Sequence, residues 1–294
     1  MIKSNRTPYF PERRECAFTL IELLVVIVTI TILASVLLPT QAGTKIGSKS
    51  LQCLNNLKQL TVGALMYQSD NGSIAHVNIN NLWITGVLSQ QPSVNIRLCP
   101  FAAQPVAGAI PNAQGTANNA WIWHVNSNPN DPNSPIVTTN GSYGLNGWLY
   151  KYNANMSYFI NPADTVNFFP SAAAIKHPSQ TPEFVDSLWP DLWPYQGGIG
   201  DNHNGAWELY ADNNNAAKSS LSNADQGMPR CCIARHGSAG PIGGTMKVAG
   251  TTQPLWNGGV NLSCADGHVE PTTLEGLWYY YWNANAIPAA RPPR

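Results

Sequence analysis

An apolar run from Phe18 to Leu38 is the feature that most constrains how this chain can fold. As an α-helix this run would rise about 31 Å, which is close to the thickness of the hydrocarbon core of a bilayer. Glu22 is the only charged residue in the run. Residues 1–17 carry four basic and two acidic side chains, and this excess favours a cytoplasmic N-terminus. The sequence therefore predicts a single membrane pass, with most of the chain on the far side.

Three hypotheses account for this segment. A cleaved secretory signal would need small residues at a cut site after the run, and residues 40–42 make a poor one. A plain anchor leaves Glu22 unexplained, because a carboxylate one turn inside a membrane helix costs about 2–3 kcal/mol. In the third hypothesis, a cut between Ala17 and Phe18 creates an α-amino group. That amine pairs with Glu22 of a neighbouring copy, so that both charges become tolerable in lipid.

A second helical pattern follows Pro39. Apolar residues recur at spacings of three and four between Leu51 and Tyr67, which indicates an amphipathic helix. The Asp-Asn-Gly stop signal at 70–72 predicts that the helix ends near Ser69. We expect the two helical segments to form one long rod that bends at Pro39 and is covered by the domain that follows.

Residues 71–294 are expected to form a β-rich head. Charged residues make up only 11% of the chain, and Asn-Gly pairs and prolines mark many turns. Long surface loops are predicted at 104–119 and 126–137. The predicted strands lie at 83–88, 120–125, 165–170, 182–189, 230–237, 244–250 and 259–274.

Composition and motifs also exclude some functions. The formal net charge is zero and no cluster of Lys and Arg follows the N-terminal segment, so no nucleic-acid partner is expected. The chain contains no Gly-x-Ser-x-Gly, P-loop or His-Glu-x-x-His motif. We therefore predict that the protein is not an enzyme.

The segment around residue 17 resembles the prepilin processing motif of type IV pilins and type II secretion pseudopilins. A basic leader, a small residue, Phe-Thr-Leu-Ile-Glu, an apolar helix and a proline follow one another in that order. The resemblance implies that a membrane peptidase cuts between Ala17 and Phe18 and methylates the new Phe18 amine. It also implies that Glu22 sets the axial register and that Pro39 kinks the helix. Ala17 stands where the family usually has Gly, and both are small enough for a tight cleavage pocket.

The rest of the chain is similar to a pseudopilin-like group that is abundant in planctomycetes and verrucomicrobia. That group is named for a His-x9-Asp-Gly pattern near the C-terminus, whereas His236 and Asp266 are 30 positions apart in this chain. We interpret residues 238–257 as a hairpin inserted between the two halves of the pattern. The resemblance implies an α+β, pilin-like fold, in which a long N-terminal helix packs on an antiparallel sheet. The similar segments are 53–72, 98–100, 142–146, 177–187, 235–237 and 258–270.

These patterns together predict the organisation of a filament subunit. Its N-terminus would be cytoplasmic, its single helix would lie in the inner membrane, and its head would be periplasmic or, after assembly, at the cell surface. The resemblance implies four partners: further copies of the chain, other pseudopilins, the prepilin peptidase and methyltransferase, and the inner-membrane assembly platform. The predicted parts are a leader at 1–17, a membrane and assembly helix at 18–39, an amphipathic helix at 40–70 and a head at 71–294, with the His-x9-Asp-Gly-like region at 231–282.

His236, Asp266 and His268 are candidate ligands for a divalent metal, if their strands pair and bring them together. Asp186 is a further candidate. The interpretation that we favour is that Asp266 and Gly267 form a hairpin turn, in which the Asp side chain caps backbone amides. His236 is then a buried hydrogen-bond partner. Ca²⁺ is a second candidate ion, through the Asn- and Asp-rich runs at 128–133, 201–205 and 211–215, although plain solvated loops are the explanation that we favour.

The six cysteines suggest disulfides in an oxidising compartment. Cys16 leaves with the leader, so five remain and at least one stays free. We predict that a disulfide joins Cys53 on the helix to Cys99 in the head, and that Cys232 or its neighbour Cys231 pairs with Cys264. The alternative for each pair is buried free thiols.

Aromatic runs at 188–195 and 277–282 raise a rival function. They could stack on sugars, in which case the protein would be a membrane-anchored polysaccharide-binding protein that never polymerises. An aromatic core is the favoured explanation. A secreted enzyme with an atypical signal is a second rival, and its mature N-terminus would lie beyond residue 40.

Overall fold

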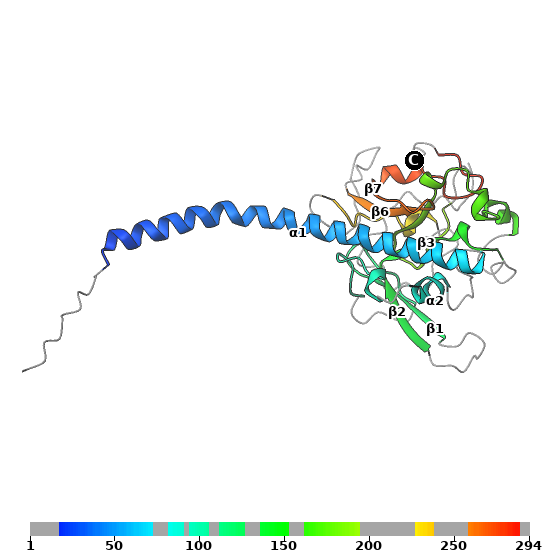
Figure 1. The fold of residues 1–294 in the computed structure, drawn as a ribbon, viewed down its shortest axis with the longest axis horizontal. Helices are drawn as coiled ribbons and strands as arrows, with labels where there is room; N and C mark the ends of the chain where they lie inside the picture. The colour runs from blue at the N-terminus through cyan, green and yellow to red at the C-terminus, as the bar shows by residue number, and fades with distance from the viewer. Residues whose placement is uncertain are drawn as a thin grey trace, which may run out of the picture. The chain divides into compact units, whose positions relative to one another are not determined.

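A computed structural model describes residues 18–72, 82–90, 94–105, 112–126, 136–152, 162–194, 227–237 and 258–288. The chain divides into two compact units, Met1–Lys45 and Ile46–Arg294, and each is described by itself. Helix α1 (Leu20–Asn71) contributes its first part to one unit and its second part to the other (Figure 1). The leader and Ala17 lie outside the described residues.

Helix α1 runs without interruption through the position of Pro39. It ends two residues after the predicted point, where Gly72 has a φ of +71° and its N–H donates to the carbonyl of Gln68 at 2.8 Å. This is the left-handed glycine stop that the Asp-Asn-Gly signal predicted. The predicted bend at Pro39 remains a prediction.

The first unit exposes its apolar side chains on every face of the helix. Side chains are described here from Phe18 to Ser35, and all of them are exposed. Within the described part of the chain, no helical stretch is both long enough and apolar enough to cross a membrane.

The second part of α1 is amphipathic, as predicted. Cys53, Leu57, Leu60 and Ala64 follow one another at helical spacing and are buried. They pack in a cluster with Trp83 of the short helix α2 (Leu82–Ser89) and with aromatic residues of the sheet. The head therefore covers this half of the helix.

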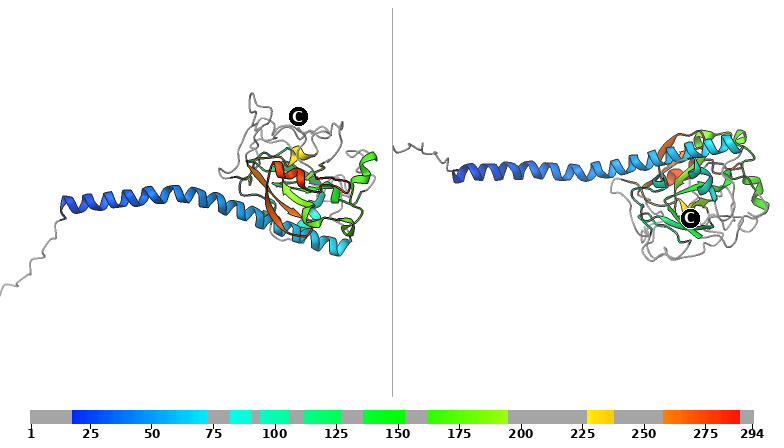
Figure 2. Two further views of the ribbon diagram at one scale, coloured as in Figure 1. Left: turned by 90° about the horizontal axis from the view of Figure 1, so that it is seen from above. Right: turned by 60° about the horizontal axis from the view of Figure 1, so that its bottom comes forward.

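The sheet of the head has five strands in the order β5-β3-β4-β6-β7. All neighbours are antiparallel except β3 and β5, so the sheet is mixed. A separate hairpin pairs β1 with β2; it is labelled in Figure 1, and Figure 2 shows the same head from two further sides. The predicted α+β class is confirmed. The strands are β1 (Trp121–Asn126), β2 (Ile136–Gly141), β3 (Tyr143–Asn146), β4 (Pro182–Asp186), β5 (Asp191–Leu192), β6 (Gly259–Cys264) and β7 (Val269–Thr273).

The sheet separates two apolar clusters. Adjacent residues of β4 point to opposite faces, so Phe184 joins the α1 cluster while Val185 joins a second cluster. The second cluster also contains Leu262 of β6 and Trp282 near the C-terminal end. Both faces of the central strands are therefore buried.

Three of the predicted strands are wrong. Residues 83–88 belong to α2, because a short apolar run fits a buried helix as well as a strand. Residues 165–170 include the end of a 3₁₀ helix, Pro162–Asn167. Residues 230–237 begin at the end of a 3₁₀ helix, Met228–Arg230, and make one isolated bridge, from His236 to Gly259. The predictions at 120–125, 182–189 and 259–274 are confirmed as β1, β4 and the β6–β7 hairpin, and 244–250 lies outside the described residues.

Candidate functional site

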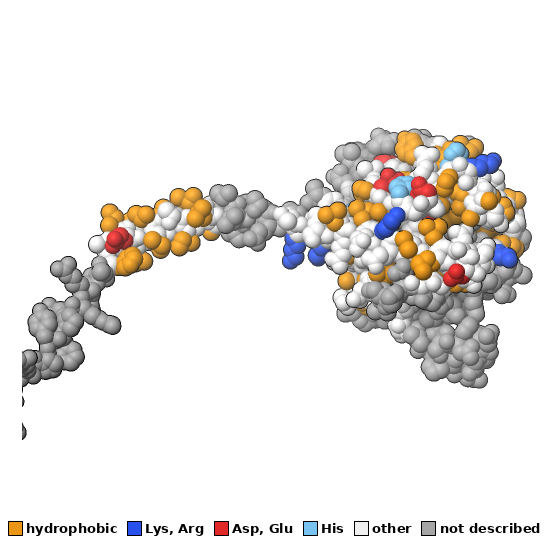
Figure 3. Space-filling model, in the orientation of Figure 1, with side chains coloured by type: hydrophobic (Ala, Val, Ile, Leu, Met, Phe, Trp, Pro, Cys, Tyr) orange, Lys and Arg blue, Asp and Glu red, His pale blue; other side chains and the backbone are white. Residues whose placement is uncertain are grey.

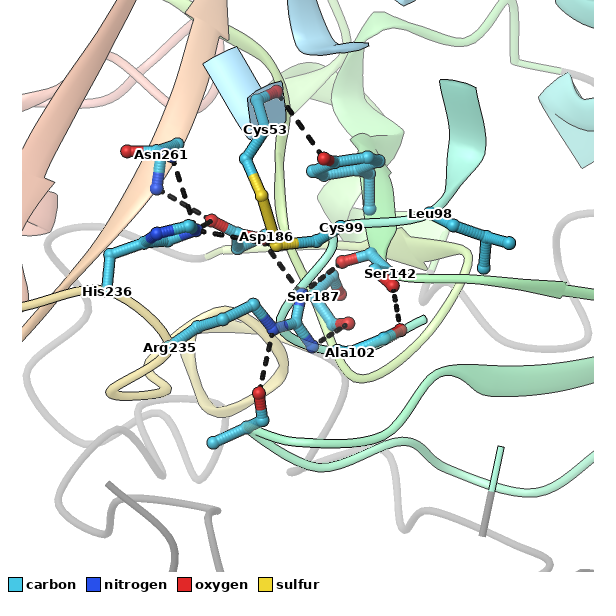
Figure 4. A network of polar contacts seen from close by, with 12 residues as sticks. Cys53, Leu98, Cys99, Ala102, Ser142, Asp186, Ser187, Arg235, His236 and Asn261 are labelled. Carbon is cyan, nitrogen blue, oxygen red and sulfur yellow. Dashed lines mark hydrogen bonds and ion pairs between the residues drawn. A yellow bond between two sulfur atoms is a disulfide. The ribbon is translucent and has the colours of Figure 1, made fainter. Parts of the chain in front are cut away.

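A buried polar network forms around Asp186, at the end of β4 (Figure 4). The Asp186 Oδ2 atom lies 3.0 Å from His236 Nε2 and accepts a hydrogen bond of 2.7 Å from the backbone N–H of Asn261. Its Oδ1 atom accepts a 3.0 Å hydrogen bond from Arg235. Asn261 lies in β6, and the bridge from His236 to Gly259 positions Arg235 and His236 beside that strand.

Arg235 is completely buried, and all three nitrogens of its guanidinium donate hydrogen bonds. Besides Asp186, it donates to the carbonyls of Ala117, Thr116, Ser187 and Ser142. A buried guanidinium is tolerable only when it is paired and its donors are satisfied, and both conditions are met here. The network thus joins the loop before β1 to strands β3, β4 and β6.

Electrostatics keep Asp186 ionised. Burial alone would raise the pKa of this carboxyl, but the charges of His236 and Arg235 and the hydrogen bonds from His236 and Asn261 more than offset burial and lower the pKa. The carboxylate therefore balances the buried arginine at neutral pH.

The same network reaches helix α1. A disulfide joins Cys53 of α1 to Cys99, and Cys99 Sγ lies 3.7 Å from His236 Nε2. Asn56 Nδ2 donates to the carbonyl of Leu98 at 2.8 Å. The predicted link between helix and head is present. The disulfide also uses both sulfurs of a Cys53, Cys99 and His236 cluster, so these cysteines offer no thiolate to a metal.

The charged members of this network are too deeply buried to meet a substrate. Asp186 and Arg235 have no exposed surface, and His236 is only 6% exposed. What the arrangement can do chemically is hold the head together: a disulfide attaches the second half of α1 to the head, and the ion cluster beside it has its buried charges paired.

The structure does not bring the three candidate metal ligands together. His236 lies beside Gly259, at the start of β6, whereas Asp266 and His268 follow the other end of that strand. A strand of this length spans about 20 Å, so the three residues cannot share an ion. The insertion at 238–257 precedes β6 and does not bring the halves of the pattern together. Asp186, the further candidate, does meet His236, but as an ion-pair partner.

The favoured hairpin interpretation is confirmed. Gly267 has a φ of +91°, and its N–H donates to the carbonyl of Cys264 at 2.8 Å. Asp266 Oδ1 accepts a 3.1 Å hydrogen bond from the backbone N–H of His268 and lies 2.6 Å from His268 Nδ1. Although partial burial opposes the change, Asp266 and Glu270 raise the pKa of His268.

The second predicted disulfide is wrong. Cys231, Cys232 and Cys264 are buried and form no disulfide. Residues 231 and 232 lie in a turn after the 3₁₀ helix Met228–Arg230 and are not paired with β6, so the strand geometry assumed for the pairing does not exist.

Glu22 has a partner that the sequence analysis missed. Its Oε2 atom accepts hydrogen bonds from the backbone N–H of Thr19 at 2.9 Å and from the Thr19 hydroxyl at 2.7 Å. The Glu22 N–H donates to the same hydroxyl at 3.3 Å. This is a capping box, and its signal, Thr followed three residues later by Glu at a helix start, is readable in the sequence. The Asn- and Asp-rich runs considered for Ca²⁺ and the side chain of Pro39 lie outside the described residues.

The aromatic runs belong mostly to the core. Trp189, Trp193, Trp278 and Trp282 are all buried, and the indole N–H of Trp282 donates to the carbonyl of Leu277 at 2.7 Å. Rings in this position cannot stack on a sugar from outside. The favoured explanation, an aromatic core, is confirmed for these residues.

No protein-family description, no curated protein and no solved structure matches the chain.

Proposed function

We propose that this chain is a pilin-like structural subunit, stored in a membrane by the start of α1 and drawn from there into a filament. The observation that carries the proposal is the contrast within α1. The helix exposes apolar side chains on every face in its first unit, yet it is clamped to a folded head in its second. A helix that is apolar all round needs lipid or other helices as its surroundings.

The exposed apolar surface favours a subunit that exchanges one partner for another. Leu24, Ile27 and Leu33 meet no covering side chain among the described residues of their unit. Lipid can cover them while the protein is stored, and the same segment of other copies can cover them in a filament core. Packing between such helices rests on close contact and on pairing of the few polar groups.

Glu22 fits this proposal in two stages. Before cleavage its carboxylate caps the helix through Thr19. Cleavage before Phe18 would place a positive amine one residue from that cap. In a bundle, Glu22 could then pair with the amine of a neighbour and fix the stagger between copies.

The first experiment is mass spectrometry of the protein isolated from its native membrane. We expect the mature chain to begin at Phe18 and to carry a methyl group on its amine. A chain that still begins at Met1, or that begins beyond residue 40, contradicts the proposal. The second of these results would favour the secreted-enzyme hypothesis.

The second experiment separates assembly from processing. We expect Glu22→Gln to be cleaved normally but to lose filaments, which are scored by shearing and electron microscopy. Asp70→Asn is the matched control, because it removes an exposed carboxylate from the other end of the same helix. Equal filament yields from the two variants would remove the proposed role of Glu22.

A further inference from the structure

The β6–β7 hairpin gathers three side chains that ligate transition metals. Cys264, His268 and Glu270 each offer one ligand atom, and these atoms all lie within 4.8 Å of one another. We propose that this hairpin binds one Zn²⁺ ion, with Cys264, His268 and Glu270 as its ligands. The site shares His268 with the triad considered above, but Cys264 and Glu270 replace His236 and Asp266 as ligands.

The strand register builds the cluster. Leu262 pairs with Glu270, and the N–H of Cys264 donates to the carbonyl of His268 at 3.0 Å. Side chains two residues apart on a strand share a face, and paired residues of neighbouring strands lie side by side on it. Cys264, His268 and Glu270 therefore lie on one face of the hairpin.

The imidazole of His268 is oriented as a ligand would be. Its Nδ1 lies 2.6 Å from Asp266 Oδ1, and because a carboxylate only accepts, Nδ1 carries the hydrogen. A carboxylate that holds the far nitrogen of a histidine is the usual support of a metal-bound imidazole. The Nε2 atom is left to face Glu270 Oε1 at 3.5 Å.

That contact calls for a cation. In a neutral imidazole with its hydrogen on Nδ1, the lone pair of Nε2 would face a carboxylate oxygen that also only accepts. Either a proton or a metal ion must lie between them. The hydroxyl of Tyr280 donates to the same Glu270 oxygen at 2.8 Å and fixes the carboxylate.

The third donor decides between these cations. The free thiol of Cys264 adds nothing to a simple histidine–carboxylate pair, whereas sulfur, nitrogen and oxygen together form a ligand set that suits Zn²⁺. Tetrahedral zinc would bring the ligand atoms to about 3.3–3.8 Å from one another, which is a short closure from their present spacing. Binding would release the thiol proton to solvent.

The site opens to solvent on one side. Cys264 is buried, but the side chains of His268 and Glu270 are 39% and 40% exposed. Acidic and histidine side chains gather on the head where the β6–β7 hairpin is drawn (Figures 1 and 3). Three protein ligands leave the fourth position of the ion for water or for a group from outside.

The test uses the full chain without a histidine tag, in detergent micelles, with Co²⁺ alone as the probe for Zn²⁺. We expect one equivalent of Co²⁺ to give a thiolate-to-cobalt charge-transfer band together with the visible bands of a tetrahedral ion. One equivalent of Zn²⁺ should abolish both. Absence of the charge-transfer band in the wild-type protein overturns the proposal and leaves a proton as the cation.

Variants then assign the ligands. Cys264→Ser should lose the charge-transfer band, and Cys231→Ser, a matched change of another buried free thiol, should keep it. Glu270→Gln should weaken Co²⁺ binding. Asp266→Asn, which changes only the support of His268, should weaken Co²⁺ binding by about 10- to 100-fold.

Near-ultraviolet circular dichroism identifies any variant that has lost its fold. A band that survives in folded Cys264→Ser, or unchanged Co²⁺ affinity in folded Glu270→Gln, would refute the assignment.

Discussion

The two parts of helix α1 contain similar apolar residues but differ in how far the side chains of these residues are exposed. In the first unit Leu24 is 50% exposed, whereas in the second Leu57 has no exposed surface. The difference follows from pattern. The first part is apolar on every face, so it has no polar face to turn towards water while another face packs on a core. The second part has one apolar stripe, which the head can cover. Pattern, rather than hydrophobicity, decides which half joins the head.

The second half is also attached to the head by a disulfide and by polar contacts. A disulfide at Cys53 and the contact of Asn56 with Leu98 attach it to the buried network around Asp186. In the first unit, by contrast, Thr19 and Glu22 bond to each other within one turn of the helix. The following predictions test whether these attachments make the difference.

Removing the centre of the network should have the largest effect. Asp186→Ala leaves Arg235 charged and buried without its counter-ion. We expect a loss of about 3–5 kcal/mol in the free energy of unfolding of the head, measured by urea denaturation of the full chain. A loss below about 1 kcal/mol would mean that the ion cluster does not hold the head together.

A matched pair of leucines tests the contrast directly. We expect Leu57→Ala to lower the free energy of unfolding of the head by about 2–5 kcal/mol, because it opens a cavity between α1 and the sheet. Leu24→Ala removes the same atoms from the exposed first part and should change that quantity by no more than about 0.5 kcal/mol. Similar losses from both variants would show that the head also depends on the first unit.

The covalent attachment comes next. Cys53→Ser with Cys99→Ser opens a loop that spans a sequence separation of 46 residues. We expect a loss of about 2–4 kcal/mol. Cys231→Ser, in a buried thiol that forms no disulfide, controls for the change of sulfur to oxygen. If the double variant loses no more than this control, the helix is held by packing alone.

The sequence predicted those parts of the fold that depend on neighbours along the chain. The amphipathic stripe from Cys53 to Ala64, the glycine stop at Gly72 and the Asp-Gly turn of the β6–β7 hairpin each follow from local pattern. Helix α2 was mistaken for a strand, because a mostly apolar run of six residues is too short to show whether its apolar positions repeat as in a helix or as in a strand.

The candidate sites were harder to predict, since they depend on strand order. Asp186 meets Arg235 and His236 only because β4 pairs with β6 and the segment before β6 bridges onto it. Nothing in the spacing of these residues specifies that pairing. The sequence offered His268 as a candidate metal ligand, with His236 and Asp266 as its companions, whereas the site proposed above combines it with Cys264 and Glu270. Cys264 and Glu270 lie within four residues of it, and the register of the hairpin could have identified them.

The smallest effect concerns a carboxyl buried against the second half of α1. Burial raises the pKa of Glu183 to about 8, and the Thr61 hydroxyl of α1 lowers it by less. The folded state therefore holds a proton that the unfolded state releases above its ordinary pKa of 4.5. The stability from this proton is complete below that pKa and declines as the pH rises towards about 8.

Between pH 6 and pH 7 we expect the wild-type protein to lose about 1.4 kcal/mol relative to Glu183→Gln, which cannot ionise. Urea denaturation of both proteins at the two pH values measures this difference. If the difference in free energy of unfolding between the two proteins is the same at both pH values, Glu183 is already ionised in the folded state. The surroundings of this carboxyl between α1 and β4 would then be more polar than its burial indicates.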